Sequence, residues 1–497
     1  MELQDKELIS IQEVRNVLQS AYDAQKKLAA MNQEEINKIT AAISRAGTKN
    51  AEKLAKMAHE ETGFGKWQDK IIKNMFASKT VYDAIKDQKT VGIIREDKSS
   101  GTIDIGIPVG VIAGIIPSTN PTSTVIYKAM IAVKGGNAIV ISPHPSAKAC
   151  ILETVNVIAR AAEQAGCPKG AIGVITVPTL AATQELMKHE KTALILATGG
   201  AAMVKSAYSS GTPAIGVGAG NGPAFIDKSA DVKRAVQRIV DSKTFDYGTI
   251  CASEQSIIIE KSLEEQVTAE LGARGAYLLS EEESKQLGKF ILRANGTMNP
   301  KIVGKSPAAI GQLAGLTNVP KDAALLIAKE TGVGMEAVYS HEKLAPILAL
   351  YVEENVDRIL ERCVEILEFE GIGHTFTMHA KDEALVKRFA RRIPASRILV
   401  NTSGALGGIG ASTNLFPALT LGCGAMGGSS SSNNIGPMDL INIKRVAYGV
   451  RELEEIRRDI PTIDTENPES CESSEMQYFV EKIVAGVLKQ LVSPADE

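Results

Sequence analysis

Short apolar runs alternate with helical patterns along most of this chain, and that alternation restricts its fold more than any other feature. In the first half, the apolar runs are residues 109–116, 138–141, 172–177, 193–196 and 214–217. Helical patterns accompany them, most clearly at residues 120–134 and 146–164. Strands that alternate with helices form a parallel sheet with helices on both faces, and such a sheet binds ligands beyond the carboxyl ends of its strands.

The same alternation resumes in the second half of the sequence. Its apolar runs are residues 256–259, 347–351, 375–378 and 397–400, and its helical patterns are residues 263–271, 281–291, 355–369 and 382–391. A boundary is expected near residues 225–245, where the segment NGPAFID gives way to a helix. The predicted fold class is therefore α/β, with two doubly wound parallel-sheet domains.

Other patterns divide the chain further. The predicted segments are a first domain at 1–230, a second domain at 231–435, a return strand region at 436–458, a polar linker at 459–474 and an amphipathic helix at 475–491. Two or three surface helices are expected within residues 2–60. The Gly-, Ser- and Asn-rich residues 404–437 should be a long loop packed over the second domain, followed by a strand within residues 438–450.

Composition excludes several classes of function. The 497 residues are 44% hydrophobic and 23% charged with a net charge of −3, so no basic field points to nucleic acid. No apolar run reaches the roughly 18 residues of a membrane span, and the segment MELQDKELIS lacks the plan of a signal peptide. The six cysteines are far apart and show no zinc-ligand spacing, so neither a metal site nor a disulfide framework is expected. We expect a cytoplasmic protein.

Cys251, within FDYGTICASEQ at residues 245–255, is the best candidate for a chemical role. Small residues flank it, so a ligand can approach the sulfur closely. An isolated cysteine is more often a buried free thiol that behaves as a small hydrophobe. The glycine-containing flanks and the Gly-rich residues 216–222 upstream favour a nucleophile instead.

Three Gly-rich segments are candidates for phosphate binding. Residues 216–222 lead into another strand and residues 404–410 also lack a following helix, so neither offers a helix N-terminus. The segment Ala197 to Met203 fits better, because a strand ends near its start and a helix is predicted after Gly200. An ordinary strand-to-helix turn remains the alternative for this segment.

These motifs, in this order, resemble the CoA-acylating aldehyde dehydrogenases. The resemblance is carried by FDYGTICASEQ together with PSTNP at 117–121, SPHP at 142–145, ATGG at 197–200 and EKLAP at 342–346, and it covers residues 10–455. It implies an aldehyde dehydrogenase-like fold whose first domain binds NAD and CoA and whose second domain carries Cys251. It also implies a homo-oligomer, a dimer or dimer of dimers, built by a β-hairpin at 95–108 and the C-terminal strand.

The resemblance assigns catalytic roles around the nucleophile. It implies that the Asn120 amide and the Cys251 N–H bind the oxyanion formed when the thiolate attacks an aldehyde. An ungapped comparison places Thr119 at that position instead, and either residue is also a suitable helix cap. His374, in GIGHT, matches a histidine of the acylating branch, with a structural histidine at a strand end as the alternative.

The resemblance also predicts the cofactor-binding residues. They are Pro117, Ser142, Pro143, His144, Thr198, Gly199, Gly200, Gly218, Glu342 and Leu344. In this interpretation Glu342 holds the nicotinamide ribose, Leu344 packs near the ring, and the segment around His144 accepts the adenine ends of NAD and CoA in turn. A surface histidine is the alternative for His144.

Val217 is the most informative departure from the hydrolytic aldehyde dehydrogenases, which carry at this point the glutamate that activates water. Without that base, an acyl-thioester on Cys251 should await another nucleophile, the CoA thiol. We therefore predict oxidation of propionaldehyde or acetaldehyde to acyl-CoA. A hydrolytic enzyme, an acyl-phosphate reductase and a scaffold with a degenerate site are the alternatives. The bifunctional aldehyde-alcohol dehydrogenases share the motifs and also carry an iron-binding domain, which we do not expect here.

The C-terminal helix at 475–491 has one apolar face that needs a groove. It resembles an encapsulation peptide, which implies placement inside a bacterial microcompartment through the shell or co-cargo. A helix that docks on its own oligomer is the alternative. A C-terminal position for such a peptide favours propionaldehyde slightly over acetaldehyde.

Overall fold

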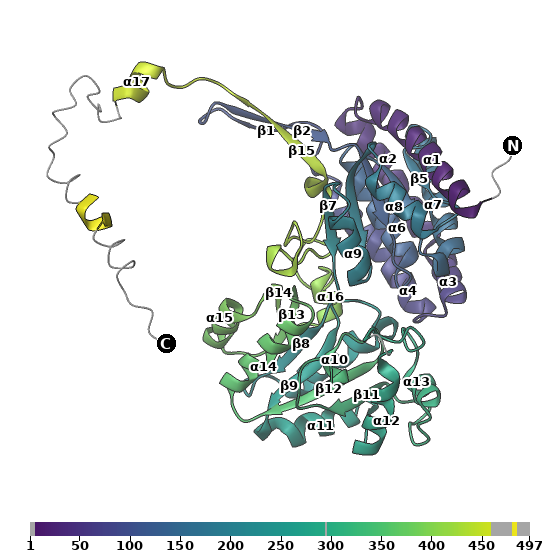
Figure 1. Cartoon of the computed structure of the whole chain (residues 1–497), viewed down its shortest axis with the longest axis vertical. Coiled ribbons are helices and arrows are strands. Elements are labelled where there is room, and N and C mark those ends of the chain that lie inside the picture. Colours follow the sequence, from purple (N-terminus) through teal and green to yellow (C-terminus); the bar gives the residue numbers. More distant parts are fainter. Residues whose placement is uncertain (1–4, 294–295, 459–479, 485–497) are drawn as a thin grey trace. The chain divides into compact units, whose positions relative to one another are not determined.

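The computed structural model describes residues 5–293, 296–458 and 480–484. These residues form three sheets (Figure 1). The chain divides into two compact units, one of residues 1–95 and 104–444 and the other of residues 96–103 and 445–497.

The first large sheet has five parallel strands in the order β5-β4-β3-β6-β7. The strands are β3 (Val111–Ile115), β4 (Ala138–Ser142), β5 (Ile172–Val174), β6 (Thr192–Thr198) and β7 (Ala214–Val217). β3 and β4 are buried along their whole length, as expected for strands that helices cover on both faces. All five predicted apolar runs of the first half are therefore strands of one sheet.

Helices of the first half pack around this sheet. They are α1 (Lys6–Leu28), α2 (Gln33–Lys49), α3 (Ala51–Thr62), α4 (Trp67–Met75), the π-helical turn η1 (Phe76–Thr80), α5 (Val81–Ile85), α6 (Pro121–Lys134), the 3₁₀ turn η2 (Pro145–Ala147), α7 (Lys148–Gln164), α8 (Leu180–Lys188) and α9 (Ala201–Tyr208). Every residue of α6 is buried, including Lys128. The Lys128 Nζ donates to Ile115 O at 2.7 Å and to Leu196 O at 2.8 Å, which ties together the carboxyl ends of β3 and β6.

The second large sheet has seven parallel strands in the order β10-β11-β12-β9-β8-β13-β14. They are β8 (Gly222–Ile226), β9 (Glu254–Glu260), β10 (Ala276–Leu278), β11 (Leu325–Lys329), β12 (Ile347–Glu353), β13 (Gly373–His379) and β14 (Ala395–Val400). Side chains alternate between two cores: Phe225 and Ile258 belong to one, whereas Ala224 and Ile257 belong to the other. The sheet is thus covered on both faces.

Helices of the second half supply these two cores. They and the short turns between them are α10 (Val232–Thr244), η3 (Phe245–Gly248), η4 (Lys261–Leu263), α11 (Glu264–Gly272), α12 (Glu281–Ile291), α13 (Pro307–Ala314), η5 (Val338–Ser340), α14 (Val356–Phe369), α15 (Glu383–Arg392), α16 (Gly404–Gly408), η6 (Ala425–Gly427) and η7 (Pro437–Leu440). Helices α10 and α11 pack in one core, and α12 to α15 pack in the other. The predicted α/β class with two doubly wound parallel sheets is confirmed.

The third sheet has the order β1-β2-β15, formed by β1 (Gly92–Asp97), β2 (Thr102–Pro108) and β15 (Ile441–Ala447). The hairpin expected at 95–108 and the strand expected within 438–450 are therefore present as strands. In the smaller unit, Tyr448 N donates to Gly101 O at 3.0 Å, and α17 (Leu453–Arg458) follows. The described residues 480–484 are helical, whereas the linker and the rest of the predicted C-terminal helix lie outside the described residues.

Three details of the prediction require correction. β8 belongs to the second sheet, so the chain crosses between the sheets at residues 218–221, ahead of the boundary expected at 230. Residues 404–437 are not wholly a loop, because α16 forms at their start: its first N–H groups donate to Glu254 Oε1 and Ser242 Oγ. Strands β10 and β11 were not predicted. Within the described ranges, no helix combines the length and apolarity that crossing a bilayer requires.

Candidate active site

A cavity of about 690 Å³ surrounds the side chain of Cys251. The carboxyl ends of β3, β6 and β7 bring Pro117 to Asn120, Thr198 to Gly200 and Val217 to Ala219 to its wall. These are the sheet-end positions at which doubly wound folds bind ligands. Glu342 and Leu344 complete the wall from the segment that precedes β12.

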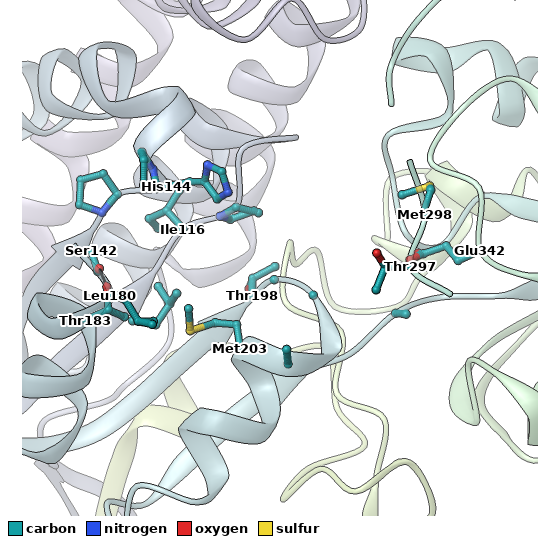
Figure 2. A pocket seen from close by; sticks show the side chains of 18 of the residues that line it. Ile116, Ser142, His144, Leu180, Thr183, Thr198, Met203, Thr297, Met298 and Glu342 are labelled. Atoms are coloured by element: carbon teal, nitrogen blue, oxygen red, sulfur yellow. Dashed lines mark hydrogen bonds between the residues drawn. The ribbon is translucent and has the colours of Figure 1, made fainter. Parts of the chain in front are cut away.

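A second cavity of about 660 Å³ shares part of this lining (Figure 2). Ser142 and Pro143 at the end of β4 line it, as do Leu180 and Met203. Figure 2 shows Ser142, Leu180 and Thr183 on one side of the space, with Thr297, Met298 and Glu342 opposite. The residues that line both cavities are Pro117, His144, Thr198, Gly199, Gly200, Ala219, Met298 and Glu342.

The structure therefore brings nearly all predicted site residues together. Cys251, Asn120, Thr119, Gly218 and Leu344 line the first cavity, Ser142 and Pro143 line the second, and Pro117, His144, Thr198, Gly199, Gly200 and Glu342 line both. His374 is the exception, since it is fully buried and lines neither cavity. Across the described parts of the chain, no cluster of three or more His, Cys, Asp or Glu side chains is arranged to hold a metal ion.

The backbone before Cys251 is held in an unusual conformation. Asp246 and Tyr247 have φ values of 49° and 52°, in the left-handed region that non-glycine residues rarely adopt. Such conformations persist only where the surrounding contacts enforce them. Here the Asp246 carboxylate accepts hydrogen bonds from the Lys70 and Lys73 ammonium groups and from the Lys66 N–H. The strained turn thus fixes the start of the segment that presents the nucleophile.

The crossing at residues 218–221 lies directly against that segment. A Cβ atom added to Gly220 would lie 2.0 Å from Cys251 O and 3.2 Å from His374 Cε1. The Gly220 N–H donates to Glu342 Oε1 at 2.9 Å, and Asn221 Nδ2 donates to Ser340 O at 2.6 Å. Only glycine permits this approach of two backbone segments beside the thiol.

Asn120 is held by a lysine that the sequence prediction missed. Lys73 Nζ donates to Asn120 Oδ1 at 2.5 Å, and Asn120 Nδ2 donates to Thr249 O at 3.2 Å. Lys73 and Lys70 lie three residues apart on α4, so they share one face of that helix, and both are buried. Their spacing is visible in the sequence, but nothing in the local pattern indicates that this charged face is buried.

The two predicted histidines occupy different environments. His144 is exposed at the cavity rim, where its Nδ1 accepts a hydrogen bond from the Ser146 N–H at 3.2 Å and caps η2. His374 Nδ1 lies 2.9 Å from Thr375 Oγ1, and burial lowers the pKa of His374 to about 3. A catalytic role for His374 stays a prediction, because the ring lies behind Gly220 and outside both cavity walls.

Burial and a neighbouring carboxylate keep the Cys251 thiol protonated. Burial, the largest effect, and the Glu342 carboxylate raise the pKa of Cys251 to about 12. Burial raises the pKa of Glu342 itself to about 8, with the Glu370 carboxylate as a second cause. The thiolate required for attack is therefore scarce until a ligand or a base changes this environment.

Replacing Glu342 with glutamine should increase the reactivity of Cys251 in the ligand-free protein. The change removes the negative charge that raises the thiol pKa, so the alkylation rate by iodoacetamide should rise about 3- to 10-fold above pH 8, where Glu342 is ionised. The rate is measured by mass spectrometry of the Cys251 peptide, with C251A as the background control. An unchanged or slower rate would show that Glu342 does not control the thiol.

Similarity to known proteins agrees with the geometry of the site. The model of the aldehyde dehydrogenase family matches residues 4–300. This chain belongs to the aldehyde dehydrogenase family. Among curated relatives of this chain, the bifunctional aldehyde-alcohol dehydrogenase AdhE of Escherichia coli is 44% identical over 88% of this chain and 50% of its own length. The chain thus spans about half the length of the first curated relatives. The acetylating succinate-semialdehyde dehydrogenase of Clostridium kluyveri is 36% identical over 88% of this chain and 96% of its own.

Solved structures also resemble this chain. A probable aldehyde dehydrogenase of Listeria monocytogenes is 63% identical with a TM-score of 0.90, over 91% of this chain and 100% of its own. An acetylating aldehyde dehydrogenase of Geobacillus thermoglucosidasius is 53% identical with a TM-score of 0.89, over 93% and 100%. Two propionaldehyde dehydrogenases, one from the Clostridium phytofermentans fucose utilisation microcompartment and one from Rhodopseudomonas palustris with bound CoA and an acylated cysteine, are each 26% identical with a TM-score of 0.79, over 88% and 97%.

Proposed function

We propose that this aldehyde dehydrogenase oxidises a short uncharged aldehyde with NAD and CoA to an acyl-CoA. The observation that carries the proposal is the shared cavity of Cys251 and Asn120, whose wall at the end of β7 is the apolar side chain of Val217. A nucleophile and an oxyanion donor are present there, while the position that holds the water-activating glutamate in hydrolytic relatives has no base.

The residues around the two cavities fit a dinucleotide. Thr198 to Gly200 end β6 and lead into α9, so backbone N–H groups at a helix N-terminus are available for a pyrophosphate. A Cβ atom on Gly200 would meet nothing within 4 Å, which leaves open space beside this turn. Ser142 and Leu180 would hold the adenine end, and Glu342 would accept hydrogen bonds from the nicotinamide ribose. Bound NAD supplies the hydride acceptor.

Cys251 carries the covalent chemistry. Its thiolate attacks the aldehyde carbon, and the carbonyl π electrons move to oxygen to form a thiohemiacetal oxyanion. The Asn120 Nδ2 and the Cys251 N–H donate to that oxyanion in this proposal. When the oxyanion re-forms the carbonyl, the hydride leaves the same carbon for the oxidised nicotinamide, and an acyl-thioester remains on Cys251.

Transfer to CoA completes the reaction. The CoA thiolate attacks the thioester carbon and the Cys251 thiolate leaves, so one aldehyde, one NAD⁺ and one CoA give one acyl-CoA, one NADH and one proton. Among the described residues that line this cavity, only Glu342 has a carboxyl group. A bound nicotinamide ribose would occupy that group, and slow hydrolysis follows because the described lining holds no second carboxylate to activate water.

The wall of the Cys251 cavity favours an alkyl aldehyde. Its apolar side chains include Phe64, Ile250, Ile409, Leu419 and Leu421. Of the two cations in this lining, Lys73 is buried and paired with Asp246, whereas Arg293 is exposed. Propionaldehyde and acetaldehyde fit the apolar part of the lining.

Assembly and placement belong to the same proposal. A homo-oligomer is supported by the third sheet, whose strand β15 is exposed along most of its length. Placement in a microcompartment is supported by the likeness of residues 475–491 to an encapsulation peptide and by the microcompartment relative from Clostridium phytofermentans. If the C-terminal tail targets the protein to a microcompartment, deleting residues 475–497 should leave turnover unchanged and abolish co-purification with microcompartment shells.

The proposed activity predicts a strict dependence on CoA. With propionaldehyde and NAD alone, NADH should form in one burst of about one equivalent per Cys251 and then stop, because the thioester has no acceptor. Adding CoA should restore steady NADH formation with propionyl-CoA as the product, identified by mass spectrometry. Steady turnover to propionate without CoA would instead assign the hydrolytic activity.

A further inference from the structure

Lys73 is a buried charge of the site to which the proposed mechanism assigns no role. It is 3% exposed, lines the Cys251 cavity and donates through its ammonium to three acceptors, Asn120 Oδ1 at 2.5 Å, Thr249 Oγ1 at 2.9 Å and Asp246 Oδ2. A lysine ammonium has three N–H bonds. All three are used within the network, so the charged lysine has no proton left to offer to a substrate.

The direction of each hydrogen bond in the network is fixed. Asn120 Oδ1 and the Asp246 carboxylate can only accept. The Thr249 hydroxyl donates to Asp246, either to Oδ2 at 2.8 Å or to O at 3.0 Å, so its oxygen must accept from Lys73. Lys73 therefore has to be the donor in all three contacts, which requires the ammonium form.

The lysine decides which end of the Asn120 amide faces which neighbour. An amide can be rotated by 180° to exchange its oxygen and nitrogen. With Lys73 bound to Oδ1, the nitrogen end must face Thr249 O at 3.2 Å and Thr119 Oγ1 at 3.3 Å. The hydrogen bond from Asn120 Nδ2 to Thr119 Oγ1 is long. An oxyanion on the aldehyde carbon that is bonded to the Cys251 sulfur can replace Thr119 as its acceptor.

We infer that Lys73 is the positioning residue for the oxyanion donor: its ammonium locks the Asn120 amide with the nitrogen toward the substrate, and Asp246 holds the ammonium in place. This inference rests on the proposed function, in which Asn120 stabilises the oxyanion. The cation also polarises the amide carbonyl, which strengthens its N–H groups as donors. Lys70 shares Asp246 but donates its other bond to the Thr119 carbonyl, so it does not orient Asn120.

The network has a defined response to pH. Burial, the largest effect, and the Lys70 ammonium lower the pKa of Lys73 to about 8, while Asp246 and Asp69 act in the opposite direction. Above that pH the neutral Lys73 amine has only two N–H groups for three acceptors. Its lone pair would then face the third acceptor, which loses its hydrogen bond. Glu342 also ionises near pH 8 and faces Cys251, so the alkaline loss of acylation should be measured in E342Q as well as in the parent enzyme.

The test is a double-mutant cycle on the burst of NADH in the absence of CoA. K73M should slow acylation about 10- to 100-fold with the aldehyde KM changed less than about 3-fold, and N120A should slow it by about 100-fold or more. In the N120A background, K73M should change the rate by less than about 3-fold, because the group it positions is gone. Asp246 keeps Lys70, Thr249 and the Lys66 N–H in K73M, so the fold has partners for the carboxylate.

K70M is the matched control, with the same burial and the same carboxylate partner. Because Lys70 acts through the Asp246 turn and not through the Asn120 amide, K70M should slow acylation less than K73M does, and its effect should persist in full in the N120A background. K73Q, which still donates to Asn120 Oδ1, should recover at least about 3-fold of the rate lost in K73M, and it replaces K73M in the cycle if that variant does not fold.

Two results would overturn the inference while the proposed function stands: a K73M rate equal to that of K70M, or a K73M effect that persists in full in N120A. If the parent enzyme shows no burst of NADH at all, the proposed function fails as well. The two failures are therefore distinguishable in one experiment.

Discussion

Replacing Cys251 with alanine is expected to abolish NADH formation from propionaldehyde, NAD and CoA, with a loss of at least about 10⁴-fold. In the proposed mechanism every product passes through a bond to this sulfur, and no other described residue of the cavity carries a thiol. The burst of NADH without CoA should disappear together with steady turnover. NADH is measured by absorbance, and the aldehyde-derived mass on the protein by intact mass spectrometry.

The control for this variant is C363A, which removes a thiol buried in α14, far along the chain from the site. C363A should lose stability by about 1 to 3 kcal/mol through the cavity it creates and keep its turnover number. If C251A retained turnover, the nucleophile would be wrong. If C251A were inactive and the natural protein were inactive too, while both gathered partners through the C-terminal tail, the scaffold alternative would stand.

Replacing Gly220 with alanine should produce the second large effect, a fall of about 100-fold or more in kcat. The added Cβ would lie 2.0 Å from Cys251 O, and a backbone atom cannot yield as a flexible side chain can. The nucleophile segment has to shift, and a displacement of about 1 Å is enough to cost about 10²-fold in rate. Steady-state kinetics with saturating NAD and CoA gives kcat, and thermal unfolding shows how much of the loss is global.

Gly272→Ala is the matched control for that substitution. Gly272 ends α11, and a Cβ atom there would meet nothing within 4 Å. The variant should keep kcat within about 2-fold, since a surface change without a steric clash rarely exceeds ±0.5 kcal/mol. An active G220A enzyme with ordinary kcat would mean that the approach of the two backbones does not set the position of Cys251.

The sequence predicted the strands of the fold more accurately than the boundary between its two large sheets. Buried parallel strands such as β3 and β4 are continuous apolar runs, so periodicity finds them. β10 has only three residues and is half-exposed, which leaves it without a clear pattern. β8 was assigned to the wrong sheet because the apolar run at 222–226 looks the same in either sheet, and only pairing with β9 and β13 decides it.

The site was predictable where one motif carries the chemistry. Cys251 and Asn120 lie in short motifs at strand ends, and the cavity joins them. Lys73 was missed because it lies 47 residues before Asn120 in the sequence and its role comes from a long-range hydrogen bond. Asp246 stood inside the cysteine motif, yet its function depends on the left-handed turn that places its carboxylate between two lysines. Such roles arise from tertiary packing, which local patterns do not encode.

The crossing at residues 218–221 has a mechanical consequence. This segment joins β7 of the first large sheet to β8 of the second, and one of its residues, Gly220, both donates to Glu342 and lies against the backbone of Cys251. A hinge motion at this segment would move the Glu342 carboxylate and the Cys251 segment together. In the proposed mechanism, such a motion during the exchange of NADH for CoA would also displace the thioester on Cys251. The exchange of cosubstrates and the alignment of the reacting atoms would then depend on the same segment of the chain.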